Sequence, residues 1–282
     1  MDVAELLDQA ALRLRAAGIV KPRREANRLW AWLHRVSPGE AYLSRDRAAG
    51  AAQARAFDAA VARRVAGEPM AYVLGHTGFR RLEIRCDARA LIPRPESEGI
   101  VEHALRRVQA GRALDLGTGT GCLALALADE GQFAEVVAVD CSAAALELAA
   151  ENAALTRRPL QLVRSDFGAA LSGERFDLIV ANPPYLTEAE YAVLDAAVRR
   201  WEPELALVSG PDGMQATRRV LQEGMLLLHE GGWLVMELDS TRAPAVAQLA
   251  SAAGYAEVAV WEDLFGRARY LTARSSPLTP DP

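Results

Sequence analysis

The chain has 282 residues, of which 51% are hydrophobic and 24% charged, and it is long enough for one large domain and a small one. Its 21 glycines and 14 prolines are close to average usage, which excludes collagen-like and low-complexity proteins. The net charge of −5 conceals an asymmetry, because residues 1–90 carry 16 basic and 10 acidic side chains, so the front of the chain could face an anionic partner.

Membrane and secretory classes are excluded as well. No stretch approaches the roughly 20 consecutive apolar residues that a membrane span needs. Residues 1–18 begin with acids and alternate apolar with charged side chains, unlike the basic start and apolar run of a secretory signal. We therefore expect a cytoplasmic protein without a membrane partner.

Residues 1–70 predict a small helical bundle. Apolar residues recur at helical spacing within residues 3–14, 26–33 and 54–65, and proline or glycine separates these segments. Between Tyr72 and Ile92, glycine turns and an alternating apolar segment predict a short hairpin. The expected boundaries are a helical domain over residues 1–72 and a hairpin linker over residues 73–95.

Residues 96–274 predict a second domain, built on a parallel sheet. From Arg112 onward, short apolar runs alternate with segments of helical periodicity, which is typical of an α/β sheet. Seven strands are expected, over residues 113–117, 135–140, 160–166, 175–185, 231–238, 256–263 and 268–274, the fourth of them ending in a motif. Residues 275–282 are rich in proline and serine and are expected to form a disordered tail.

The first predicted strand carries Asp115 and runs directly into a helix through the loop Gly117, Thr118, Gly119, Thr120 and Gly121. Glycines allow positive φ angles and leave room for a ligand against the backbone, while the helix amino terminus presents free N–H groups to an anion. A dinucleotide fingerprint would need glycine or alanine where Cys122 stands, and a Walker loop would need a Gly-Lys pair that the chain lacks.

The next two predicted strands end in residues that suit a nucleoside. Asp140, at the end of the second strand, can hold the two hydroxyls of a ribose. Asp166 and Phe167, at the end of the third, can bracket an adenine ring with a hydrogen bond and an apolar face. Because open α/β sheets bind ligands at the carboxyl ends of their strands, three consecutive strand ends predict one nucleoside site.

The fourth predicted strand leads into Asn182-Pro183-Pro184-Tyr185. The two prolines stiffen the loop and remove N–H donors, which leaves the Asn182 side-chain oxygen and the Pro183 carbonyl as acceptors. Tyr185 offers a planar aromatic face. A planar NH2 group fits this arrangement, because it can donate two hydrogen bonds while the aromatic ring stacks on it.

These motifs resemble those of class I S-adenosylmethionine-dependent methyltransferases that modify planar amino or amide nitrogens. Residues 67–75, Phe79 and residues 91–98 further resemble the interdomain segment of the HemK/PrmC family, the glutamine methyltransferases of peptide chain release factors. The resemblance extends from the helical domain to about Arg274.

Three positions depart from the family pattern. Ser97 stands where the family usually has threonine, and Phe167 stands where it often has tryptophan. After the fifth strand the chain has Glu237-Leu238-Asp239, where many members have Glu-His-Gly or Glu-Ile-Gly. The last departure leaves the role of that loop open.

The resemblance implies a Rossmann-like class I methyltransferase fold with a mostly parallel seven-stranded sheet, and an amino-terminal helical domain that docks the substrate. It implies S-adenosylmethionine as cofactor, and methyl transfer to the glutamine amide nitrogen in the Gly-Gly-Gln motif of release factors, which modulates translation termination. It assigns cofactor contacts to Gly117, Thr118, Gly119, Thr120, Gly121, Asp140, Asp166, Phe167 and Asn182. It assigns substrate contacts to Asn182, Pro183, Pro184 and Tyr185, with Asn182, Pro183 and Tyr185 as catalytic candidates. We expect a monomer with no metal and no direct nucleic-acid partner.

Other functions stay open at this point. An enzyme that methylates the exocyclic amine of adenine would use the same motif, but it needs surface to read or flip bases. Residues 91–282 carry 27 acidic against 16 basic side chains and show no recognition insertion. A methyltransferase of a ribosomal-protein glutamine is a closer alternative. A non-catalytic S-adenosylmethionine-binding assembly factor would be expected to lose Asn182-Pro183-Pro184-Tyr185, and Cys122 disfavours a nicotinamide dehydrogenase.

Overall fold

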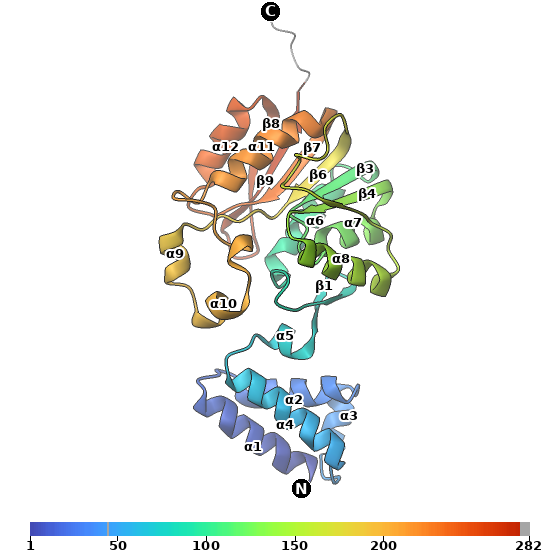
Figure 1. The fold of residues 1–282 in the computed structure, drawn as a ribbon, viewed down its shortest axis with the longest axis vertical. Coiled ribbons are helices and arrows are strands. Elements are labelled where there is room, and N and C mark those ends of the chain that lie inside the picture. Colours follow the sequence, from blue (N-terminus) through green and yellow to red (C-terminus); the bar gives the residue numbers. More distant parts are fainter. Residues whose placement is uncertain (44, 277–282) are drawn as a thin grey trace, which may run out of the picture. The chain divides into compact units, whose positions relative to one another are not determined.

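The computed structural model describes residues 1–43 and 45–276 (Figure 1). The chain divides into two units, one of residues 1–76 with 195–201, the other of residues 77–194 with those from 202 onward. The predicted tail, residues 275–282, lies outside the described residues from 277 on, and Ser275 is the last residue of the final strand. Within the described ranges, every helix falls short of the length and apolarity that a membrane crossing requires.

The first unit is helical. Its elements are α1 (Val3–Ala16), α2 (Pro22–Leu33), α3 (Pro38–Leu43), α4 (Ala51–Val65), α5 (Met70–Leu74) and α10 (Ala196–Trp201). Its core is formed by side chains at helical spacing, among them Leu7, Leu14 and Phe57, all buried. Helix α1 begins at a capping box, in which the side chains of Asp2 and Glu5 each accept the other residue's backbone N–H. The predicted helical bundle is confirmed.

The second unit is built on a seven-stranded sheet. Its strands are β3 (Ala110–Leu116), β4 (Gln132–Asp140), β5 (Gln161–Arg164), β6 (Phe176–Ala181), β7 (Leu228–Glu237), β8 (Tyr255–Glu262) and β9 (Ala268–Ser275). They lie in the order β5-β4-β3-β6-β7-β9-β8, and β9 is antiparallel to both β7 and β8, whereas the other adjacent pairs are parallel. The prediction of a mostly parallel seven-stranded sheet is confirmed.

Two groups of helices cover this sheet (Figure 1). One group is α6 (Glu98–Leu105), α7 (Cys122–Glu130) and α8 (Ala143–Thr156), and the other is α11 (Gln215–Leu227) and α12 (Ala243–Ala252). Alternate residues of β6 face the two groups: Ile179 and Ala181 belong to the core that includes Val220 of α11, whereas Leu178 and Val180 point the other way. Residues 178–181 are all fully buried, which accounts for their uninterrupted apolar run.

Shorter elements complete the second unit. The predicted hairpin is present as β1 (His76–Phe79) and β2 (Leu82–Arg85), which form a separate two-stranded sheet. The fully buried Asn152 of α8 ties it down, because its side chain accepts from the N–H of Arg85 at 2.7 Å and donates to the carbonyl of the same residue. The remaining elements are α9 (Glu188–Ala192) and the 3-10 turns η1 (Pro95–Ser97) and η2 (Glu204–Ala206).

The order in which the chain adds strands to the sheet reverses between β3 and β6. From β3 the chain proceeds outward through β4 to β5, and from β6 it proceeds the opposite way to β7. The two strands are parallel neighbours, with Leu116 opposite Ala181 at their carboxyl ends. The segments that leave these two strands therefore diverge, and such a point is where open α/β sheets bind ligands.

Replacing Ile179 with alanine should lower the free energy of unfolding by about 2–5 kcal/mol, because it leaves a cavity at a fully buried position. Urea denaturation followed by circular dichroism measures the change. The matched control is Leu155→Ala, at a side chain that is 52% exposed, which should change the free energy by less than about 0.5 kcal/mol. Equal losses in the two variants would contradict the core assigned here.

Candidate active site

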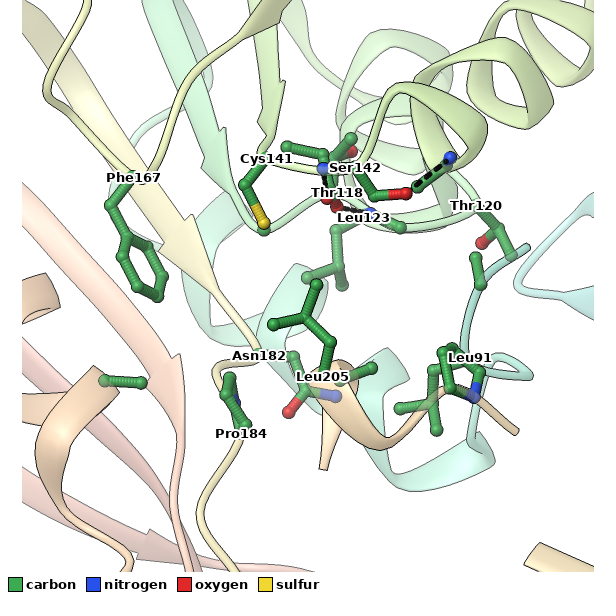
Figure 2. Close-up of a pocket in the computed structure, with 18 of the residues that line it drawn as sticks. Leu91, Thr118, Thr120, Leu123, Cys141, Ser142, Phe167, Asn182, Pro184 and Leu205 are labelled. Atoms are coloured by element: carbon green, nitrogen blue, oxygen red, sulfur yellow. Dashed lines mark hydrogen bonds between the residues drawn. The ribbon is translucent and has the colours of Figure 1, made fainter. Parts of the chain in front are cut away.

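A cavity of about 340 Å³ lies at the carboxyl ends of the central strands, a volume in the range of small-molecule sites. The loops after β3, β4, β5 and β6 line it, together with residues 89–94 of the linker and part of η2. Figure 2 shows Phe167 on one side of the cavity and Leu91 on the opposite side, with Asn182 and Pro184 between them in this view.

Most of the predicted site residues line this one cavity, namely Gly117, Thr118, Gly119, Thr120, Asp140, Asp166, Phe167, Asn182 and Pro184. Gly121, Pro183 and Tyr185 are not among its lining residues. Gly121 is the residue before the first turn of α7, and Pro183 is buried. Burial raises the pKa of Tyr185 to about 12, so its phenol stays protonated at neutral pH.

Backbone hydrogen bonds hold the glycine loop against the end of β4. The N–H groups of Gly117 and Thr118 both donate to the carbonyl of Val139, at 2.9 and 2.8 Å. Gly117 has a φ of +78°, and no atom lies within 4 Å of the position that a Cβ would take there. The left-handed backbone favours glycine here, and Gly117 is one of the residues that line the cavity.

Asp115 lies beneath the loop and is fully buried at the end of β3. Its Oδ2 accepts from the hydroxyl of Thr118 at 2.6 Å and from the N–H of Ala124 at 3.2 Å, whereas its Oδ1 has no hydrogen-bond partner. Burial raises the pKa of the Asp115 carboxyl to about 7, against the effect of these two hydrogen bonds. Asp115 thus links the loop to α7 rather than facing a ligand.

Asp140 is half-buried at the cavity wall, and both of its carboxylate oxygens are already engaged. Oδ2 accepts from the N–H of Gly119 and Oδ1 from the N–H of Ser142, each at 2.9 Å. These bonds fix the carboxylate in place and leave each oxygen a further lone pair. The geometry is compatible with the predicted pair of ribose hydroxyls.

The segment after β5 depends on Arg219 of α11, a residue that the sequence analysis missed. Asp166 is exposed, and its carboxylate accepts from Arg219 at 2.7 Å, while its carbonyl accepts from the same guanidinium at 3.1 Å. That guanidinium also lies 4.9 Å from the centre of the Phe167 ring. The backbone of Phe167 is left-handed, with a φ of +48°, and the next N–H, of Gly168, donates to Glu223 of α11 at 2.6 Å.

Asn182 follows β6 directly and is hydrogen-bonded to a network of two residues that the sequence alone does not place in the site, Ser97, which also lines the cavity, and the buried Glu237. Its Nδ2 donates to the hydroxyl of Ser97 at 2.9 Å, and that hydroxyl donates to the carboxylate of Glu237 at 2.7 Å. Ser97 and the segment that contains Glu237 are two of the positions at which the sequence departs from the family pattern. Nothing in local periodicity signals that positions 85 and 140 residues apart meet at one point.

Family models match both units of the chain. The model of the PrmC N-terminal domain matches residues 5–75, and that of the methyltransferase small domain matches residues 97–205. The release factor glutamine methyltransferase of Cereibacter sphaeroides is 42% identical over 276 residues, which cover 97% of this chain and 99% of that protein. The protein of the same name from Deinococcus radiodurans is 41% identical over 278 residues, with the same shares covered.

The chain belongs to the release factor glutamine methyltransferase family. Its methyltransferase fold is also found in a T. thermophilus 16S rRNA N2 methyltransferase, solved in complex with AdoMet and guanosine. That structure has a TM-score of 0.52 and 22% identity, over 71% of this chain and 49% of that chain. Family membership confirms the resemblance drawn from the linker and from Asn182-Pro183-Pro184-Tyr185, and it makes a dehydrogenase untenable.

Asp115→Asn should remove one source of pH-dependent stability. A carboxyl whose pKa is raised from 3.8 to about 7 holds a proton in the folded protein that the unfolded chain releases, so its stabilisation is complete below pH 4 and is lost as the pH rises towards 7. Between pH 5 and 8, the wild type should therefore lose free energy of unfolding relative to Asp115→Asn. Parallel curves in urea titrations across this range would contradict the raised pKa.

Proposed function

We propose that this protein transfers a methyl group from S-adenosylmethionine to the side-chain amide nitrogen of the glutamine in the Gly-Gly-Gln motif of peptide chain release factors, and so modulates translation termination. The observation that carries the proposal is the placement of Asn182 on the cavity wall, next to the glycine loop, in a chain of this family. The helical unit, which matches the PrmC N-terminal domain, is proposed to dock the release factor.

The cavity fits S-adenosylmethionine. The left-handed backbone of Gly117 borders open space, where a side chain would intrude on a ligand. The fixed carboxylate of Asp140 suits the ribose hydroxyls, Phe167 offers a face to the adenine ring, and the N–H groups at the start of α7 suit the carboxylate of the methionine part. When bound, this cofactor supplies a methyl group made electrophilic by its sulfonium.

The residues of the chain then have to orient a weak nucleophile. An amide nitrogen reacts poorly, because its lone pair is delocalised into the carbonyl. We assign the Asn182 side-chain oxygen and the Pro183 carbonyl as acceptors for the two N–H bonds of the substrate amide, with Tyr185 beside the motif. Two acceptors align the nitrogen for attack and favour the positive charge that develops on it. No strong base is needed, since the methylated nitrogen loses its proton readily.

Asn182→Ala should abolish methyl transfer while leaving cofactor binding measurable, because it removes an acceptor for the substrate and leaves the glycine loop intact. The purified protein is incubated with S-adenosylmethionine and unmodified release factor, and the Gly-Gly-Gln peptide is examined by mass spectrometry for the mass of one added methylene. Full activity in the variant would contradict the role of Asn182. If the wild type binds cofactor but adds no mass, a ribosomal-protein or nucleic-acid substrate becomes the better hypothesis.

Gly117→Ala should weaken binding of S-adenosylhomocysteine at least about tenfold, as measured by isothermal titration calorimetry, because it adds a methyl group and backbone strain to a loop that lines the cavity. Gly173→Ala is the matched control, since Gly173 also has a positive φ, +85°, and open surroundings but does not line the cavity. Both variants should lose a similar free energy of unfolding, roughly 1–2 kcal/mol, from the left-handed conformation. Equal affinity in both would remove the glycine loop from the cofactor site.

A further inference from the structure

Asn182 stands at one end of a buried chain of hydrogen bonds formed by three distant segments. Its Nδ2 donates to the Oγ of Ser97, the last residue of η1, at 2.9 Å, and that Oγ donates to the Oε2 of Glu237, the last residue of β7, at 2.7 Å. Ser97 and Glu237 are each only 2% exposed. The network therefore begins at the cavity wall, which Asn182 and Ser97 both line, and ends at the buried carboxylate of Glu237.

The direction of these hydrogen bonds follows from the number of protons available. A carboxylate can only accept, so the single hydroxyl proton of Ser97 goes to Glu237. The oxygen of Ser97 can then only accept, and it selects the NH2 end of the Asn182 amide. The Oδ1 of Asn182 accepts no hydrogen bond from the described residues, and Asn182 is one of the residues that line the cavity (Figure 2).

The charge of Glu237 sets this direction. Arg269 of β9 has its Nη1 3.6 Å from the Oε1 of Glu237, and Arg269 is in turn held by Asp263 at 2.8 Å. Burial raises the pKa of Glu237 above its ordinary value, although the Ser97 hydrogen bond and the Arg269 charge oppose the rise, so the direction described holds at pH values where Glu237 is ionised. A neutral Glu237 would be able to donate to Ser97, and the amide of Asn182 would then turn its NH2 towards the cavity.

The backbone that carries Ser97 is also fixed. The hydroxyl of Tyr270 donates to the carbonyl of Glu96 at 2.6 Å, which ties η1 to β9. On the other side of Ser97, a Cβ at Gly99 would lie 2.4 Å from the Cζ of the same tyrosine, so turn and ring are in close contact. The contact with Tyr270 therefore fixes the backbone from which Ser97 reaches Asn182.

We propose that Ser97 and Glu237 are positioning residues that determine which end of the Asn182 amide faces the cavity. The proposal rests on the proposed function only in naming Asn182 as the acceptor of the substrate amide. With the network intact, Oδ1 receives the substrate N–H. With the amide reversed, two NH2 groups face one another, and the substrate nitrogen loses an acceptor as its positive charge develops.

Kinetics provide the first test, with release factor and S-adenosylmethionine as substrates. Ser97→Ala should lower kcat about ten- to a hundredfold with cofactor affinity changed less than twofold, and Ser97→Thr, which keeps the hydroxyl, should retain kcat within about threefold. Ser275→Ala is the matched control, because Ser275 is a buried, hydrogen-bonded serine outside the cavity lining, and it should leave kcat unchanged. Unchanged kcat in Ser97→Ala, or equal losses in Ser97→Ala and Ser97→Thr, would overturn the proposal.

The part played by Glu237 is tested by non-additivity. Glu237→Met removes the acceptor of the Ser97 proton at similar volume, and it should lower kcat by about as much as Ser97→Ala. Since both changes act through the orientation of Asn182, the double variant should be no slower than the slower single variant. Losses that multiply in the double variant would show two independent effects and contradict a single network.

A second measurement needs no methyl acceptor and so separates this proposal from the proposed function. The chain has three asparagines, so selective 15N-asparagine labelling yields three pairs of side-chain amide signals, from exposed Asn27, fully buried Asn152, and Asn182. The Asn182 amide protons should exchange more slowly than those of Asn27. Ser97→Ala should shift the Asn182 signals and speed their exchange while sparing Asn152, which bonds to Arg85 and Thr120. Unmoved Asn182 signals would refute the network even if release factor is not the substrate.

Discussion

The parallel pairing of β3 with β6 is the constraint on which the candidate site depends. These strands run side by side with Ala113 to Leu116 opposite Leu178 to Ala181, all buried, and the order of the sheet reverses between them. Parallel pairing brings both carboxyl ends to one edge, so the glycine loop and Asn182 leave the sheet together. A shift of the register between β3 and β6 would move the glycine loop away from Asn182, although both have to lie at the same cavity.

The sequence predicted those parts of the site that depend on local backbone chemistry. Alternate glycines between strand and helix, and two prolines after a buried strand, are constraints that act within a few residues, and the structure has both loops at the cavity. The sheet was predictable for the same reason, since strands buried on both faces have continuous apolar runs. The apolar segment 178–181 is the clearest case.

The parts that the sequence could not predict are contacts between distant segments. Arg219 comes 53 residues after Asp166, and Glu237 comes 140 residues after Ser97, so only the folded arrangement pairs them. Tertiary packing also gave different surroundings to residues within one motif. Asn182 and Pro184 line the cavity, whereas Pro183 and Tyr185 do not, so successive residues of the motif alternate in their surroundings.

The left-handed backbone at Phe167 has a consequence for the thermodynamics of binding. A bulky residue at positive φ is unfavourable by roughly 1–2 kcal/mol, and here the hydrogen bonds that Arg219 and Glu223 make with the neighbouring backbone hold it there. That conformational cost is met during folding, so a ligand that stacks on the ring has less disorder to suppress. Binding of a ligand against Phe167 should therefore carry a small entropic penalty, as it does in other preorganised sites.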